Sequence, residues 1–132
     1  MLFQMDVAGG PPEDVLRQFW ADQDAPEELR RFAEDLVRGV ARERLFLDSV
    51  VAGSAENWRI ERMAVVDRNV LRIAVYEMVF DAEVPPVVAI DEAIEVARKF
   101  GSEESGAFIN GILDAVRKRI ERGEVAPRGD GR

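Results

Sequence analysis

Three carboxylates stand close together in the pattern D-E-x-x-E, at Asp91, Glu92 and Glu95. Residues three and four apart share one face of a helix, so this spacing could hold a metal ion or form an acid–base pair. Helical di-iron sites add a Glu-x-x-His pair, and the sequence has no histidine. Helix capping by Asp91 is the simpler interpretation, and we expect no metal site.

Nucleophilic chemistry lacks its usual partners in this sequence. Ser49, Ser54 and Ser105 have no imidazole base, and there is no cysteine. The absence of cysteine and histidine also excludes disulfides, thiolate nucleophiles and Cys/His zinc sites. We therefore expect a protein that is not an enzyme and that carries no cofactor.

The charge of the chain is acidic and unevenly distributed. Residues 1–35 contain nine acids and three arginines, a net charge of −6, whereas the other 97 residues contribute only −2 to the total of −8. An acidic surface repels phosphate backbones and attracts basic partners. We expect weak binding of nucleic acid by the chain alone and a basic protein partner.

The length of 132 residues and the hydrophobic content of 47% are enough for one buried core. We expect a single domain over residues 1–122 and a disordered tail over 123–132, because that segment has little to bury. There is no apolar run long enough for a membrane span and no basic segment ahead of the short apolar start. These features predict a cytoplasmic protein with no membrane partner.

Apolar residues recur with the period of helices, and no strand-like alternation or hairpin turn interrupts them. The sequence predicts an all-α fold, a compact bundle of six or seven helices. Asp67 should cap the helix that is apolar on most sides and therefore central, and Gly101 should close the next one. The expected helices lie at about residues 1–8, 12–22, 26–53 (the longest), 60–65, 67–80, 90–100 and 102–122, with an extended link at 84–87.

Three stretches of the sequence resemble the NusB family of transcription antitermination factors. Residues 67–78 (DRNVLRIAVYEM) are similar to the family's "LR-I/L-A-x-YE-L/M" helix. Residues 84–101 (VPPVVAIDEAIEVARKFG) resemble "P-x-x-V-A-I-N/D-EA-I/V-E-L-A-K-x-FG", and residues 108–114 (FINGILD) resemble "F-V/I-NG-V/I-LD". The three stretches follow one another at the family's spacing, so together they are far more specific than any one alone.

The resemblance implies an all-α bundle that binds the small-subunit ribosomal protein NusE. It also implies joint recognition of boxA RNA from ribosomal RNA operons, within the RNA polymerase antitermination complex. Family members usually begin with an arginine-rich segment, whereas this sequence starts with Met1-Leu2-Phe3-Gln4-Met5, part-way along the first helix. That difference implies either a start further upstream or weaker RNA binding.

Partner contacts are expected on the helix that follows Asp67, at Arg72, Tyr76 and Glu77. An acid in a mostly apolar helix either lies on its exposed stripe or faces an interface, and the resemblance favours contact of Glu77 with NusE. Tyr76 can fill the edge of the core or anchor an interface. Arg72 stands four residues after Arg68, a spacing also typical of an ordinary solvated surface.

RNA contacts are expected at Arg98, Lys99, Phe108 and Asn110. The two cations suit phosphate groups, although such pairs are more often only solvated. Phe108 can be a core residue or an exposed ring on which a base stacks. Gly111 inside a helix usually permits a close helix approach, and Asn110 could bond the same neighbour.

Two other functions fit the same fold. NusB-like domains also occur in front of RNA cytosine methyltransferases, as accessory domains of an enzyme. Alternatively, the chain could be a structural protein that forms a homodimer through apolar helix faces. Both alternatives keep the predicted all-α architecture.

Overall fold

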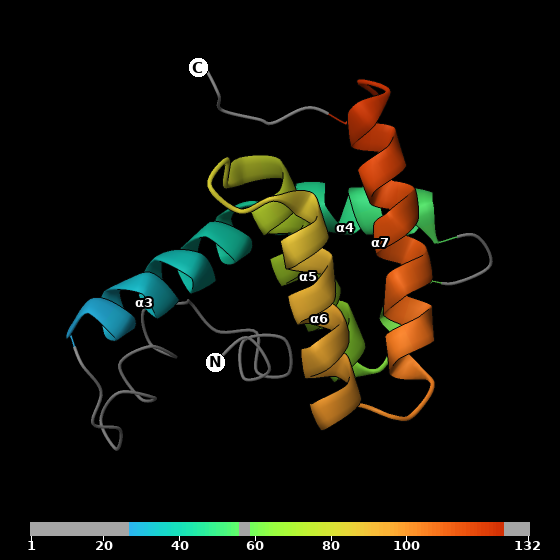
Figure 1. The fold of residues 1–132 in the computed structure, drawn as a ribbon, viewed down its shortest axis with the longest axis horizontal. Helices are drawn as coiled ribbons and strands as arrows, with labels where there is room; N and C mark the ends of the chain where they lie inside the picture. The colour runs from blue at the N-terminus through green and yellow to red at the C-terminus, as the bar shows by residue number, and fades with distance from the viewer. Residues whose placement is uncertain (1–26, 56–58, 126–132) are drawn as a thin grey trace. The chain divides into compact units, whose positions relative to one another are not determined.

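A computed structural model describes residues 27–55 and 59–125 of the chain. The chain divides into two units, Met1–Glu43 and Arg44–Arg132. All regular elements in the described ranges are helical, five α-helices and one short 3-10 helix (Figure 1). The all-α prediction is confirmed, but the count of six or seven helices is not matched. The helices expected at 1–8 and 12–22 lie outside the described residues.

The single long helix expected over 26–53 is in fact two helices, α3 (Glu27–Arg42) and α4 (Arg44–Ser54). A turn at Glu43 separates them. Buried Val40 and Leu47 stand seven residues apart, so the apolar period continues across the break. The pattern of apolar residues therefore could not reveal it.

Helix α5 (Val65–Phe80) is the centre of the second unit, as predicted. It contacts α4, α6 and α7, and its buried side chains include Leu71 and Val75. The helix follows the 3-10 turn η1 (Ile60–Arg62), which replaces the short helix expected at 60–65. Asp67 does not cap the helix, because Ala64 holds the cap position and Asp67 lies buried inside the first turn.

Helix α6 (Pro86–Phe100) begins earlier than the sequence suggests. Pro86 is its first residue, although 84–87 was expected to be extended. Proline suits this position because the first helical N–H groups have no partner within the helix. The cap at Gly101 is confirmed, and its N–H donates to the Ala97 carbonyl at 2.8 Å.

Helix α7 (Ser105–Glu121) returns beside α6, and Figure 1 shows the two helices side by side. The helix starts three residues later than expected, after a turn in which the Ser105 N–H donates to the Ser102 carbonyl at 3.1 Å and the Ser105 hydroxyl accepts the Ser102 N–H at 3.0 Å. Val125, three residues beyond the boundary expected at residue 122, is also buried. The rest of the expected tail, 126–132, lies outside the described residues.

A buried ion pair joins α5 to α4. The Arg72 guanidinium donates to both carboxylate oxygens of Asp48, at 2.7 and 3.1 Å, and to the Asn69 side-chain oxygen at 3.0 Å. Only 4% of Arg72 is exposed. Its charge is therefore paired inside the helical unit, so Arg72 does not belong to the expected partner surface.

Candidate functional site

The first candidate surface combines aromatic rings with acids, and we call it the acidic–aromatic surface: Tyr76, Glu77, Phe80, Asp81 and Glu92. The Tyr76 and Phe80 rings lie 5.1 Å apart, and both residues are half-buried. Glu77 is half-buried on the same helix. Rings with one apolar side and one wet edge are typical of protein interfaces.

Electrostatics make this surface receptive to a cation. Burial raises the pKa of the Glu77 carboxyl above its usual 4.5, and the negative charges of Glu92 and Asp81 raise it further. The ionised form of Glu77 is thus disfavoured in the isolated chain. A positive group placed here would offset the repulsion between Glu77 and the other two carboxylates. It would also stabilise the ionised Glu77 carboxylate in place of the lost solvent.

Replacing Glu77 with glutamine is expected to stabilise the chain slightly at pH 7. Folding raises the pKa of the Glu77 carboxyl above its usual 4.5. The wild-type protein therefore loses stability relative to Glu77→Gln as the pH rises from 4.5 through the raised pKa of the folded state. The gain should be well under about 1 kcal/mol, since solvent screens a half-buried group. Urea unfolding at pH 7 and pH 4 measures it, with Glu95→Gln as an exposed control. An equal gain at both pH values would contradict this explanation.

The second candidate surface is a hollow beside Phe108, of about 210 Å³. Its lining includes Arg62, Met63, Asp67 and Ser105. The Asp67 Oδ1 atom is buried and has no hydrogen-bond partner among the described residues. The half-buried Phe108 ring beside this hollow offers a flat face that suits stacking of a nucleobase.

The other predicted RNA residues do not gather at this hollow. Arg98 packs over Gly106, where an added Cβ would lie 2.9 Å from the Arg98 Nε atom. Asn110 is exposed one turn after Gly106, on a face of α7 different from that of Phe108. Lys99 is exposed, with its Nζ atom 5.9 Å from the Phe100 ring centre.

The model of the NusB family matches residues 1–118. The chain is a member of the NusB family. A relative from Anaeromyxobacter sp. (strain Fw109-5) is 52% identical over 116 residues, which cover 87% of this chain and 80% of the relative. One from Desulforapulum autotrophicum is 42% identical, with coverage of 93% and 89%. Both are named transcription antitermination protein NusB.

Solved structures of NusB proteins have the same fold. NusB from T. maritima is similar with a TM-score of 0.81 at 36% identity, covering 94% of this chain and 89% of that one. A structure of antitermination factors NusB and NusE in complex with dsRNA gives 0.79 at 25% identity, with coverage of 89% and 87%.

Gly111 in this NusB-family chain does not serve a close helix approach, contrary to the sequence-based expectation. An added Cβ would meet nothing within 4 Å among the described residues. Gly111→Ala should therefore raise the free energy of unfolding by about 0.5–1 kcal/mol, the usual cost of a glycine inside a helix. Thermal and urea unfolding measure the change. A loss of stability would mean that something does pack against this position.

Two features of the site were missed by sequence reasoning. Asp67 was expected to be a helix cap, and its burial depends on Gly101, where a Cβ would lie 3.2 Å from Asp67 Oδ1 and 2.7 Å from Ser105 Oγ. The cations Lys118, Arg119 and Arg122 were not recognised as a group. Only their spacing of three and four residues on one helix could have indicated it.

No described helix combines the length and the apolar character that a membrane crossing needs.

Proposed function

We propose that this chain is a transcription antitermination adaptor, which binds the ribosomal protein NusE and, jointly with it, boxA RNA. The observation that carries the proposal is the similarity over 89% of the chain to a NusB solved with NusE and dsRNA. Relatives named transcription antitermination proteins, matched over 80% or more of their length, support the same role. Binding of partners, without catalysis, suits the residues present.

The acidic–aromatic surface is the proposed docking site for NusE. Tyr76 and Phe80 supply apolar contact area, and Glu77, Asp81 and Glu92 supply negative charge. Charge of one sign steers a partner of the opposite sign and fixes its orientation. We therefore expect a basic face of NusE to cover Glu77 and to lower the pKa of its carboxyl.

RNA binding is proposed at the hollow beside Phe108. Stacking of a base on this ring requires little positive charge. Arg98, Lys99 and Asn110 remain predicted RNA contacts, although they do not line this hollow. Because the chain carries a net charge of −8, RNA should bind far better when a basic protein is already docked.

Titration of labelled boxA RNA, with and without saturating NusE, tests the proposal. We expect NusE to increase the affinity of the chain for RNA by about 5- to 150-fold, the range of typical coupling between sites. The RNA affinity of NusE alone must be measured as the control. If the chain and NusE bind RNA independently, the adaptor mechanism fails.

The accessory domain of an RNA cytosine methyltransferase is the weaker alternative. The relatives above are named antitermination proteins, and this chain covers 80–89% of their length. A cytoplasmic location and a place in the RNA polymerase antitermination complex follow from the proposed role. The single domain over residues 1–122 and the homodimer stay predictions.

A further inference from the structure

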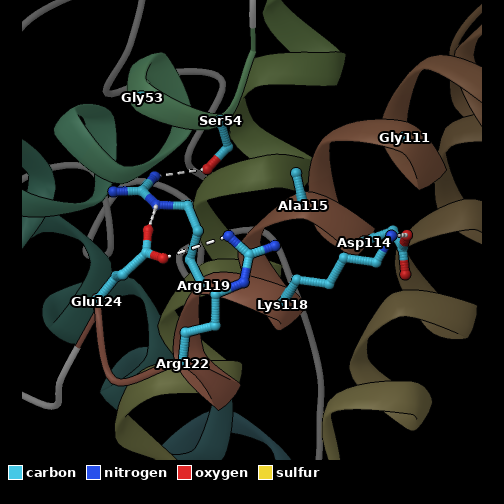
Figure 2. A pocket seen from close by; sticks show the side chains of 9 residues that line it. All are labelled: Gly53, Ser54, Gly111, Asp114, Ala115, Lys118, Arg119, Arg122 and Glu124. Atoms are coloured by element: carbon cyan, nitrogen blue, oxygen red, sulfur yellow. Dashed lines mark hydrogen bonds and ion pairs between the residues drawn. The ribbon is translucent and has the colours of Figure 1, made fainter.

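A second hollow, of about 520 Å³, lies between the end of α4 and the last turns of α7 (Figure 2). Gly53 and Ser54 line it from α4, and Gly111 and Ala115 line it from α7. No part of this hollow belongs to the acidic–aromatic surface or to the Phe108 site. Figure 2 shows three basic side chains in it: Lys118, Arg119 and Arg122.

Arg119 is held in a fixed position. Its Nη1 atom donates to the Ser54 hydroxyl at 2.7 Å and to the Val50 carbonyl at 3.2 Å, and its Nε atom lies 3.7 Å from the Glu124 carboxylate, which a bound anion would have to displace. The guanidinium lies against Gly53, where an added Cβ would be 3.0 Å from Nη1. A planar cation that is already positioned loses little conformational freedom when it binds an anion.

The other two cations remain largely in solvent. Arg122 pairs with Glu124 at 3.3 Å, and Lys118 pairs with Asp114 at 3.2 Å, but their side chains are 63% and 53% exposed. Three cations face two acids here, a local charge of +1 on a protein of net charge −8. This hollow is thus more receptive to an anion than the chain as a whole.

The hollow lies on the same side of α7 as Phe108. Positions 108, 111, 115, 118 and 122 follow one another at intervals of three and four residues, which places them in one row along the helix. Gly111 and Ala115 leave the middle of this row almost bare, and nothing described lies within 4 Å of a Cβ at Gly111. From Phe108 to Arg122 the row is roughly 21 Å long.

We propose that single-stranded RNA held at Phe108 continues along this row of α7, and that Arg119, Arg122 and Lys118 bind one of its phosphate groups. The bare segment at Gly111 lets the sugar–phosphate backbone lie close to the helix. The proposal rests on the RNA-binding role proposed above. Basic residues also stabilise the negative end of a helix, but that effect does not depend on RNA.

The test compares the salt dependence of RNA binding by Arg122→Gln, Arg42→Gln and wild type, each with saturating NusE. Arg42 is the matched control, because its side chain is 64% exposed, it pairs with a neighbouring glutamate at 3.4 Å, and it does not line the hollow. Loss of one phosphate contact should reduce the slope of log Kobs against log salt by about 0.7 for Arg122→Gln only. Equal slopes in both variants would overturn the proposal.

A second measurement separates steric fit from charge. Gly111→Leu should fold, because the space around Gly111 is open, and it should weaken binding of a long RNA at least fivefold relative to Gly111→Ala. RNA shortened so that it ends at the Phe108 site should bind both variants equally. Equal affinity of the two variants for the long RNA would contradict the proposed path.

The two proposals fail in different ways. If wild type with NusE binds RNA and Phe108→Ala weakens that binding, the RNA-binding role stands, and normal behaviour of Arg122→Gln would refute only the path along α7. If wild type binds no RNA with NusE present, both proposals fail.

Discussion

Replacement of Asp48 by alanine is expected to lower the free energy of unfolding by about 3 kcal/mol. The Arg72 guanidinium is buried and would lose the carboxylate that it contacts through two hydrogen bonds. Removal of one partner of a buried pair costs about 3–5 kcal/mol, because the remaining charge loses its counter-charge while it stays out of water. The lower end applies since 22% of the Asp48 side chain is exposed. The melting temperature should fall by about 10 °C.

A double replacement distinguishes the electrostatic cost of removing the Asp48 carboxylate from the loss of packing. Asp48→Leu combined with Arg72→Met removes both charges and fills similar space, so most of the lost stability should return. Urea unfolding of the four variants forms a double-mutant cycle. If the double variant is as unstable as Asp48→Ala, the ion pair is not the reason for the loss.

Replacement of Phe108 by alanine is expected to weaken RNA binding by about 1–3 kcal/mol, the range measured for loss of one aromatic stacking platform. This corresponds to a roughly 5- to 150-fold higher Kd. The flat face of the half-buried ring beside its hollow is the physical reason. Fluorescence anisotropy with boxA RNA and saturating NusE measures the effect.

Phe108→Tyr and Phe108→Leu are the matching controls. Tyrosine keeps the flat ring and should retain the affinity, whereas leucine keeps apolar volume without a stacking face and should lose it. Urea unfolding of each variant shows whether the fold is intact. Similar RNA affinity of the leucine and wild-type proteins would exclude stacking on this ring.

Helix type and order were predictable from the apolar period, but boundaries and the pairing of polar residues were not. Pro86 was expected to lie in an extended link, because proline is accepted at a helix start as readily as in a loop. The partner of Arg72 stands 24 residues earlier in the chain. Nothing in local spacing indicates a contact over that distance.

The candidate site was predictable only in part, and for a related reason. The identity of Phe108 suggested stacking, but only the structure shows that Asp67 lines the same hollow while Asn110 is on another face. Gly111 was expected to touch a neighbouring helix because glycine is otherwise costly there. Its open surroundings agree with the apolar stripe of α7, because buried Ile109, Ile112 and Val116 place Gly111 on the opposite side of the helix.

The short links around α6 have a consequence for how this part of the chain folds. Five residues separate α5 from α6, four separate α6 from α7, and each helix packs on the next. Closure of such short loops sacrifices little chain entropy, and proteins rich in local contacts fold in microseconds to milliseconds. The packing of α5, α6 and α7 is therefore of a kind that assembles quickly, whereas the second hollow also needs α4, whose contact with α7 joins residues 65 positions apart.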